Sequence, residues 1–342
     1  MNLESTQAPL AARPAHHRPG GGFRNPWPGT QPTGLRGLLK WAYDRARRRS
    51  TARLAAPPTL ATPAQAVPRA AAHELRLTAV GHSTFLLQLG GLNILTDPIW
   101  GERASPFTFA GPRRRHAPGL AFDALPPIDI VLQSHDHYDH FCEGTVRALA
   151  RAHPDATWCA PIGVAARLRA RGVKRTVERD WWESARVGDA TVHCLPAAHF
   201  SGRTPFDRDQ TLWCGWSVEA HARRAYFVGD TGAHPDFGLI GSRLGACDLV
   251  MMPVGAYEPR WFMRSVHMDP AEALAAFNEL TRSHGAHRSV MVAMHWGTFV
   301  LTDEATDEPP RRTKELWAEA GRPSDRLWVL SPGETRALDR AR

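Results

Sequence analysis

The sequence predicts an α/β fold in which two sheets pack face to face and helices cover their outer faces, a four-layer αββα sandwich with an irregular basic N-terminal arm. Two observations support this prediction. Short apolar runs rich in β-branched residues occur both as hairpins and in alternation with helical segments, in two rough halves of the chain. In addition, the first 73 residues contain 11 Lys and Arg but only 2 Asp and Glu, whereas the remainder is nearly neutral.

The N-terminal region falls into two parts. Residues 1–22 are rich in Pro, Ala and Gly, a composition that predicts a disordered tail. Residues 23–73 form a basic arm and linker. Within them, residues 34–50 place leucines at helical spacing and end in four arginines: Leu35, Leu38, Leu39, Arg45, Arg47, Arg48 and Arg49. This pattern predicts a basic amphipathic helix, which either lies on an anionic membrane or packs its apolar stripe on the main body.

The main domain is expected to cover residues 74–342. Predicted strands lie at 75–80, 84–89, 92–95, 129–133, 157–160, 190–195, 212–219, 224–228, 247–252, 289–294 and 326–330. Predicted helices cover 143–152, 162–171, 269–281 and 311–320. The third of these helices begins with Asp269 and Pro270, a pair that is typical of a helix start.

Composition and charge exclude several classes of protein. No apolar run approaches the roughly 20 residues of a membrane span. The N-terminus lacks the apolar core of an export signal, so we expect a cytoplasmic protein, peripheral on the inner face of the membrane if the arm binds lipid. The five cysteines are scattered and odd in number, as expected in a reduced compartment. Because the net charge of +8 belongs to the arm, we expect no nucleic-acid partner.

The turn from Ser134 to His140 is the centre of the predicted site. It follows the strand at 129–133 and offers four potential metal ligands: His135, His137, Asp139 and His140. Imidazole nitrogen and carboxylate oxygen together suit zinc and similar divalent metals. Four ligands of one tight turn cannot all bind a single ion, so the spacing predicts two adjacent metals.

Further histidines and aspartates follow other predicted strands: Asp97, His199, Asp230 and His295. Residues at strand ends converge at one edge of a sheet, where loops build sites on a rigid scaffold. Without Asp97, these residues and the turn together supply seven ligands. That number suits two metals of four to five coordination that share one bridging carboxylate.

Several short motifs accompany the ligands. They include Asn25-Pro26-Trp27-Pro28, Gly81-His82, Leu95-Thr96-Asp97-Pro98, Asp180-Trp181-Trp182-Glu183, Gly229-Asp230-Thr231-Gly232, GAYEPRWFM at 255–263 and HWGTF at 295–299. On these motifs, the chain from about Phe23 to Gly333 resembles hydrolases of the metallo-β-lactamase fold. More narrowly, it resembles the N-acylphosphatidylethanolamine-hydrolysing phospholipase D family. The histidine turn by itself indicates only the superfamily, whereas the last two motifs are far more specific.

The resemblance implies two zinc ions per chain. It assigns the ligands in three groups: His135, His137 and His199 to the first ion, Asp139, His140 and His295 to the second, and Asp230 to both. Asp97 would orient a ligand from outside the coordination shell. Two positions depart from the family. Asp136 replaces an Asn and adds negative charge beside the metals, and Phe200 replaces the Trp of mammalian members.

Other residues are candidates for catalysis and substrate binding. His267 matches a family histidine and would assist the phosphoryl or leaving group, with Asp139 as the other catalytic residue; alternatively, His267 packs locally at a helix start. Tyr257, Arg260 and Trp261 would line a groove for acyl chains, with Arg260 near the phosphate, or they form a packed loop core.

The predicted function is that of a zinc-dependent phosphodiesterase of phospholipase D type. It would hydrolyse N-acylphosphatidylethanolamine-like phospholipids to phosphatidic acid and N-acylethanolamine through a metal-bridging hydroxide. Hydrolysis of a small soluble ester, lactone or sugar phosphate is the alternative, since the same site serves many leaving groups. The expected partners are the phospholipid substrate and an anionic membrane surface. The sequence leaves the oligomeric state open, a homodimer included.

Overall fold

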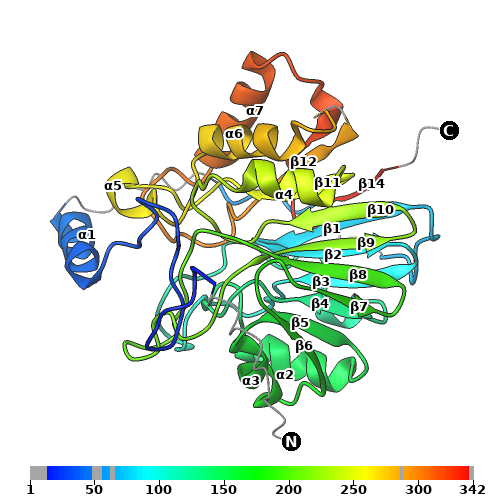
Figure 1. Ribbon diagram of the computed structural model, residues 1–342, viewed down its shortest axis with the longest axis horizontal. Coiled ribbons are helices and arrows are strands. Elements are labelled where there is room, and N and C mark those ends of the chain that lie inside the picture. Colours follow the sequence, from blue (N-terminus) through cyan, green and yellow to red (C-terminus); the bar gives the residue numbers. More distant parts are fainter. Residues whose placement is uncertain (1–13, 48–55, 62–65, 286–287, 339–342) are drawn as a thin grey trace, which may run out of the picture.

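The computed structural model describes residues 14–47, 56–61, 66–285 and 288–338. Two seven-stranded sheets face each other, with helices outside them, so the predicted four-layer αββα sandwich is confirmed (Figure 1). The first sheet has the order β14 (Thr335–Leu338), β1 (Leu75–Gly81), β2 (Thr84–Leu89), β3 (Leu92–Thr96), β4 (Ile130–Leu132), β5 (Thr157–Pro161) and β6 (Arg175–Arg179). The second has the order β13 (Leu327–Trp328), β12 (Val290–Met294), β11 (Leu249–Pro253), β10 (Arg223–Phe227), β9 (Gly215–Ala220), β8 (Ala190–Leu195) and β7 (Ser184–Val187).

Both sheets are mixed. The pairs from β14 to β3 are antiparallel and those from β3 to β6 are parallel. In the second sheet, β10 to β13 pair in parallel and β7 to β10 pair antiparallel. Parallel pairs need crossover connections, which the helices provide. The carboxyl ends of the parallel strands therefore lie at one common edge of the sandwich.

Helices cover the outer face of each sheet (Figure 1). α2 (Glu143–Ala152) and α3 (Val164–Arg169) lie on the first sheet, and α4 (Phe237–Leu244), α6 (Pro270–Thr281) and α7 (Glu308–Glu319) lie on the second. The alternation of strand side chains matches this layering. Phe85, Leu87 and Leu89 of β2 lie in the core between the sheets, whereas Leu86 lies in the cluster under α2 and α3.

Five helices and strands were absent from the prediction: β6, β7, β14, α4 and the short α5 (Arg260–Met263). The three strands are all edge strands, and they carry charged, partly exposed residues instead of an apolar run. α4 contains Gly238 and Gly241, which lower its intrinsic helix propensity. The predicted helix at 311–320 begins earlier, at Glu308, because the two prolines that follow fit the first turn of a helix.

Residues 14–22 differ from the predicted disordered tail. His16 and His17 each place Nε2 on one oxygen of Asp180, at 2.6 and 2.7 Å, and the ring of His16 stacks on Trp181. The Phe23 backbone N–H donates to the Asp209 carbonyl at 2.8 Å. These contacts attach the segment to the domain, and composition alone does not reveal them. Residues 1–13 lie outside the described residues.

The predicted arm helix is present as α1 (Leu35–Arg47) and contacts α5 (Arg260–Met263) at one end of the molecule (Figure 1). Trp41 stacks on Phe262 and donates its indole N–H to Asp303 at 2.9 Å. Leu38, Leu39 and Tyr43 are 45%, 61% and 59% exposed. The helix thus contacts the domain through Trp41, and Leu38 lines a cavity beside it, while Leu39 and Tyr43 face solvent. The predicted Arg48 and Arg49 lie outside the described residues.

None of the helices in the described part of the chain has both the length and the apolar character needed to cross a bilayer.

The contact between α4 and α6 gives a test of the packing. A Cβ at Gly241 would lie 1.9 Å from the Leu280 carbonyl oxygen of α6. We expect Gly241→Ala to lower the free energy of unfolding by about 1–3 kcal/mol, because backbone of the neighbouring helix cannot give way. Gly238→Ala on the same helix is the control, since its Cβ would lie 3.5 Å from the nearest atom, Glu279 Oε2. Urea denaturation of both variants checks the expectation; equal stability would contradict the close packing.

Candidate metal centre

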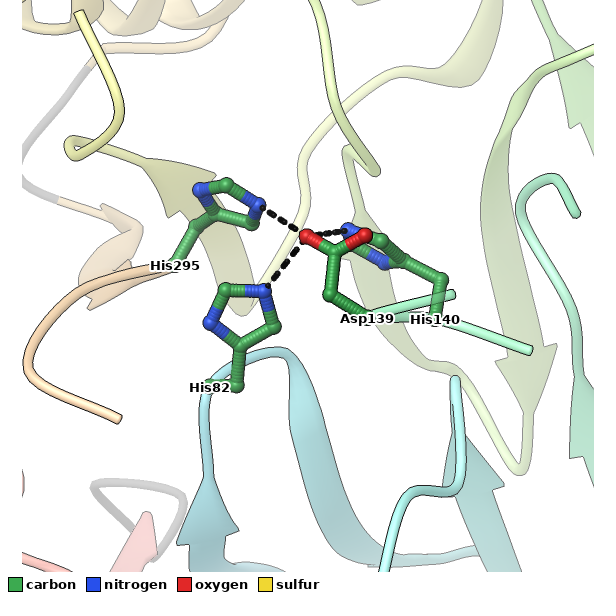
Figure 2. Close-up of side chains that lie close together, drawn as sticks. All are labelled: His82, Asp139, His140 and His295. Carbon is green, nitrogen blue, oxygen red and sulfur yellow. Dashed lines mark hydrogen bonds and ion pairs between the residues drawn. The ribbon is translucent and has the colours of Figure 1, made fainter. Parts of the chain in front are cut away.

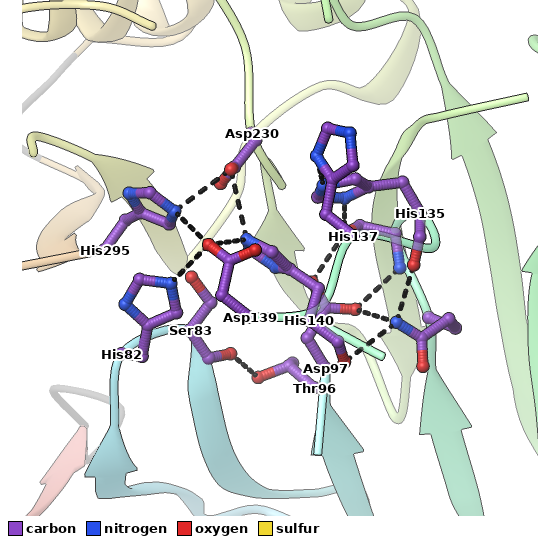
Figure 3. Close-up of polar contacts among 12 residues, drawn as sticks. His82, Ser83, Thr96, Asp97, His135, His137, Asp139, His140, Asp230 and His295 are labelled. Carbon is purple, nitrogen blue, oxygen red and sulfur yellow. Dashed lines mark hydrogen bonds and ion pairs between the residues drawn. The ribbon is translucent and has the colours of Figure 1, made fainter. Parts of the chain in front are cut away.

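The loops that follow four strands bring the predicted ligands to one edge of the sandwich (Figure 3). The turn after β4 of the first sheet carries four of them: His135, His137, Asp139 and His140. The loops after β8, β10 and β12 of the second sheet carry His199, Asp230 and His295. The structure therefore brings all seven residues together, and it takes them from both sheets.

The backbone at these strand ends is unusual. Asp97 and His295 have positive φ values of 30° and 64°. Such values are uncommon for residues with a Cβ, and they concentrate at functional sites. Gly229 precedes Asp230 with a φ of 69°, and a Cβ there would lie 2.7 Å from the Cys214 carbonyl oxygen. The positive φ values at Asp97 and His295 therefore coincide with the turns that direct these side chains toward one point.

His135, His137 and His199 form the first cluster. His137 Nδ1 lies 2.9 Å from His135 Nε2 and 3.2 Å from His199 Nε2. His199 Nδ1 donates to the Val266 carbonyl at 3.0 Å. Ser134 Oγ donates its only proton to Asp97, so it must accept a hydrogen bond from His135 Nδ1 at 2.8 Å.

The outer nitrogens of His135 and His199 therefore carry the protons in their neutral forms. Their inner nitrogens present lone pairs to each other and to His137. Lone pairs of three imidazole nitrogens that face one another repel, so this arrangement is unfavourable without a cation. The same arrangement suits a zinc-like ion, which would accept all three lone pairs.

Asp139, His140 and His295 form the second cluster together with Asp230, whose Oδ2 contacts both histidines (Figure 3). His82 lies in the same group of possible ligands as Asp139, His140 and His295. Asp230 Oδ2 lies 3.0 Å from Nε2 of both His140 and His295, and Asp139 Oδ2 lies 3.4 Å from each of the same atoms. Both Nε2 atoms are buried and have no hydrogen-bond partner among the described residues. Ligands about 2.0–2.1 Å from a tetrahedral ion lie roughly 3.3 Å apart, so these four atoms fit a divalent metal.

Asp230 connects the two clusters. Besides its contacts with His140 and His295, its Oδ2 lies 3.9 Å from His199 Nε2 of the first cluster. The assignment of this carboxylate to both metals, and of the other six residues to one metal each, stays a prediction.

Burial and charge set the protonation of the site. Burial lowers the pKa of His137 to about 4 and that of His199 to about 3, so both are neutral near pH 7. Burial opposes ionisation of Asp230, but His140 and His295 outweigh it and hold its pKa well below the usual range. Burial also opposes protonation of His295, but Asp230 raises its pKa to about 9. A divalent ion would replace the protons on these imidazoles, since metal binding requires neutral ligands.

Asp97 lies behind both clusters and is fully buried. Its carboxylate accepts hydrogen bonds from His140 Nδ1 at 2.6 Å and from the backbone N–H and hydroxyl of Ser134 at 2.7 and 2.5 Å. Because Ser134 in turn holds His135, Asp97 orients one ligand in each cluster. Such bonds suit a residue that orients metal ligands from outside the coordination shell, and that role of Asp97 stays a prediction.

His267 lies at the site. Its ring centroid is 5.1 Å from that of His199 and 5.2 Å from that of His295. The same imidazole lines an apolar cavity of about 260 Å³ whose other walls include Trp41, Phe200, Phe262, Met263 and Leu301. The cavity thus runs from the metal clusters toward α1.

Most of the predicted substrate-binding residues use their polar groups in contacts with other residues of the chain. Tyr257 donates its hydroxyl to Glu308 at 2.8 Å and is buried. Arg260 pairs with Glu272 at 2.5 Å and donates to the carbonyls of Tyr257 and His267. Only Trp261 is substantially exposed, at 47%. These contacts match the packed-loop alternative, and substrate binding by the three residues stays a prediction.

Asp136 does not place negative charge beside the metals as expected. Its oxygens accept hydrogen bonds from the Gly202 backbone N–H and the Thr211 hydroxyl, both at 3.0 Å, and form an ion pair with Arg167 at 3.0 Å. The side chain therefore turns away from both clusters, and Arg167 offsets its charge. Phe200, in contrast, packs its ring 4.4 Å from that of His137 and lines the cavity.

Sequence reasoning missed one residue of the site, His82. Its Nε2 lies 3.1 Å from Asp139 Oδ2, and its side chain is buried. It occupies the short turn between β1 and β2, where a single histidine carries no spacing signal. The available hint was the Gly81-His82 motif, which supported the family resemblance but was given no role at the site.

The comparisons with known proteins agree with this geometry. A family model described as a Beta-lactamase superfamily domain matches residues 92–296. An uncharacterized protein of Mycobacterium tuberculosis is 43% identical over 277 residues, which are 80% of this chain and 72% of that protein. N-acyl-phosphatidylethanolamine-hydrolyzing phospholipase D 1 of Caenorhabditis elegans is 38% identical over 250 residues, 70% of this chain and 68% of that protein.

Among solved structures, the isothiocyanate hydrolase from Delia radicum gut bacteria superposes with a TM-score of 0.60 at 21% identity. The match covers 77% of this chain and 99% of the other, and at this identity it supports the fold alone. From the family match, the relatives and the two His/Asp clusters, the chain belongs to the metallo-β-lactamase superfamily and is a metal-dependent hydrolase.

Proposed function

We propose that the protein is a dinuclear zinc phosphodiesterase that hydrolyses N-acylphosphatidylethanolamine-like phospholipids to phosphatidic acid and N-acylethanolamine. The observation that carries the proposal is the apolar cavity that opens beside two His/Asp clusters sharing one carboxylate. A phospholipid combines an apolar chain with a phosphodiester, and the cavity and the clusters fit these two parts. The similarity to the worm phospholipase D supports the same substrate class.

Two bound divalent ions would supply a nucleophilic water at neutral pH and offset charge on the phosphoryl oxygens. The chain itself holds the ligands at 3.0–3.4 Å separations in the second cluster and excludes bulk water from them. It also aligns the outer nitrogens of His135, His140 and His199 with fixed acceptors. The site is thus organised before substrate arrives, which limits the reorganisation that a reaction requires.

His267 is the chain's candidate for a polar contact with the phosphoryl or leaving group. Burial holds its pKa well below the usual range, so its imidazole is neutral near pH 7. Its Nδ1 has no hydrogen-bond partner among the described residues. A neutral imidazole at the cavity wall can donate one N–H to a substrate oxygen and accept a proton at its other nitrogen.

The cavity would hold part of an acyl chain. Its volume of about 260 Å³ lies near the lower end of the usual range for ligand pockets. Apolar side chains from α1, α5 and the loops at 200–208 and 301–302 line it. Because α1 belongs to the basic arm, the arm completes the cavity as well as carrying charge.

The first test is metal content. Purified protein should hold close to two zinc or similar ions per chain, and Asp230→Asn should lose most of them, because Asp230 Oδ2 contacts both clusters. Elemental analysis after desalting measures this. Asp155→Asn is the control, since Asp155 is an exposed carboxylate whose side chain is 83% accessible. A wild-type protein without metal, or an Asp230→Asn variant that keeps both ions, would refute the centre.

The second test concerns the bond that breaks. Hydrolysis in heavy-oxygen water should place the label on the phosphate of phosphatidic acid and leave N-acylethanolamine unlabelled, because water attacks phosphorus. Mass spectrometry of both products measures this. Label in a released fatty acid would instead show carboxyl-ester cleavage. Absence of turnover on the phospholipid, with turnover of a small ester, lactone or sugar phosphate, would favour the alternative hydrolase.

We further propose that the arm attaches the enzyme to anionic membranes. α1 exposes Leu38, Leu39 and Tyr43 together with the basic residues Arg36, Lys40 and Arg47. The domain also exposes the aromatic side chains of Phe107 and Phe206. Phe107 lines a surface pocket together with Tyr138 of the histidine turn. An apolar surface beside basic residues fits the headgroup region of an anionic bilayer.

The third test separates docking from chemistry. Replacing Arg36, Lys40 and Arg47 by Gln should weaken binding to anionic vesicles on the order of 100-fold at low salt, since each basic residue near the surface contributes about 1 kcal/mol. The loss should shrink as salt rises. Turnover of a short soluble substrate should stay within twofold of wild type. The control is the variant with Arg311→Gln and Arg312→Gln on α7. Docking by the arm would be contradicted if vesicle binding fell equally in the arm variant and the control, or if it did not fall in the arm variant.

A further inference from the structure

His82 contacts the second cluster from outside the predicted ligand set (Figure 2). Its side chain is 1% exposed, and its Nε2 lies 3.1 Å from Asp139 Oδ2. His140 and His295 approach the same oxygen at 3.4 Å. All three imidazoles therefore meet one carboxylate oxygen, and two of them also meet Asp230.

The tautomer of His82 follows from its surroundings. Its Nδ1 is buried and has no hydrogen-bond partner among the described residues. A proton on Nδ1 would leave a buried N–H without an acceptor, which is unfavourable. It would also turn the Nε2 lone pair toward a carboxylate oxygen, which is a second unfavourable contribution to the free energy. A proton on Nε2 gives an N–H···O bond to Asp139 instead. His82 is thus a hydrogen-bond donor to Asp139. It differs from His140 and His295 in its partners, because among the described contacts only those two histidines also approach Asp230.

The backbone of His82 is held in place by the loop that carries His295. His82 has a φ of 58°, in the left-handed region. Its N–H donates to Thr298 Oγ1 at 2.7 Å, and its carbonyl accepts from the His295 N–H at 3.2 Å. His116 Nε2 approaches the same Thr298 hydroxyl at 2.9 Å. A strained position that its surroundings keep in place is typical of a functional constraint.

We propose that His82 is a positioning residue for the metal ion of the second cluster. Its N–H donates to Asp139 Oδ2, the oxygen that His140 and His295 also approach. The bond would fix the orientation of the carboxylate and set the affinity for this ion, while the first cluster has no contact with His82 in the described structure. The inference depends on the two-metal centre proposed above.

Partners of this kind typically change metal affinity by 10- to 100-fold when removed. We expect His82→Ala to lower the affinity for one of the two zinc ions by about that factor. The affinity for the other ion should stay unchanged. His82→Gln should recover most of the loss, because its amide N–H can reach Asp139. Both variants keep a Cβ at the same left-handed position, so backbone strain is common to them.

The measurement is a titration of metal-free protein with zinc in competition with a chromogenic chelator. The titration is repeated with cobalt, whose visible absorption follows binding at the second cluster. His234→Ala is the matched control. His234 is also a buried histidine, but it stacks between Trp27 and Phe237. Melting temperatures of the metal-free variants report whether each one folds.

Several outcomes would overturn the inference. His82→Ala with wild-type affinity for both ions would show that the bond does not matter. Loss of both ions in the Ala and Gln variants alike would make His82 a residue of the fold. Equal weakening of one ion in both variants would make it a direct ligand. Fewer than two ions in the wild type would overturn the two-metal centre and this inference with it, so the two failures are distinguishable.

Discussion

The buried carboxylate of Asp97 is the contact on which the site depends. It is fully buried at the end of β3 and accepts hydrogen bonds from Ser134, His140 and Gln133. A buried carboxylate is costly unless donors surround it, so these residues must stay in one arrangement for the fold to keep it. Because Ser134 and His140 begin and end the histidine turn, one residue fixes the shape of the whole turn. Both clusters inherit their geometry from that shape.

The centre also couples the two sheets. The first sheet supplies Asp97, the histidine turn and His82, whereas the second supplies His199, Asp230 and His295. Neither sheet alone holds a complete cluster, so the ligands converge only when the sheets are packed face to face. Metal binding to such a site stabilises the folded state by mass action. The metals would therefore strengthen the sheet interface in addition to any part in chemistry.

The sequence revealed the candidate ligands because each one follows an apolar run. A histidine or aspartate directly after such a run must lie at a strand end, and strand ends share an edge, so Asp230 and His295 could be placed without coordinates. His82 could not, because a lone histidine in a two-strand turn says nothing about which carboxylate it meets. The direction of Asp136 was equally hidden, since it depends on Arg167 of α3. Polar strands such as β6 lack the apolar run on which strand prediction rests.

The segment between β11 and α6 joins the cavity to the metal ligands. Arg260 binds the carbonyls of Tyr257 and His267, and its ion pair with Glu272 ties the loop to the first turn of α6. Within the same loop, Val266 lines the cavity and its carbonyl accepts the bond from His199 Nδ1. One residue thus belongs both to the cavity wall and to the contacts that orient His199. The residues of the motif at 255–263 thus hold together the loop that contributes both Val266 and His267 to the cavity wall.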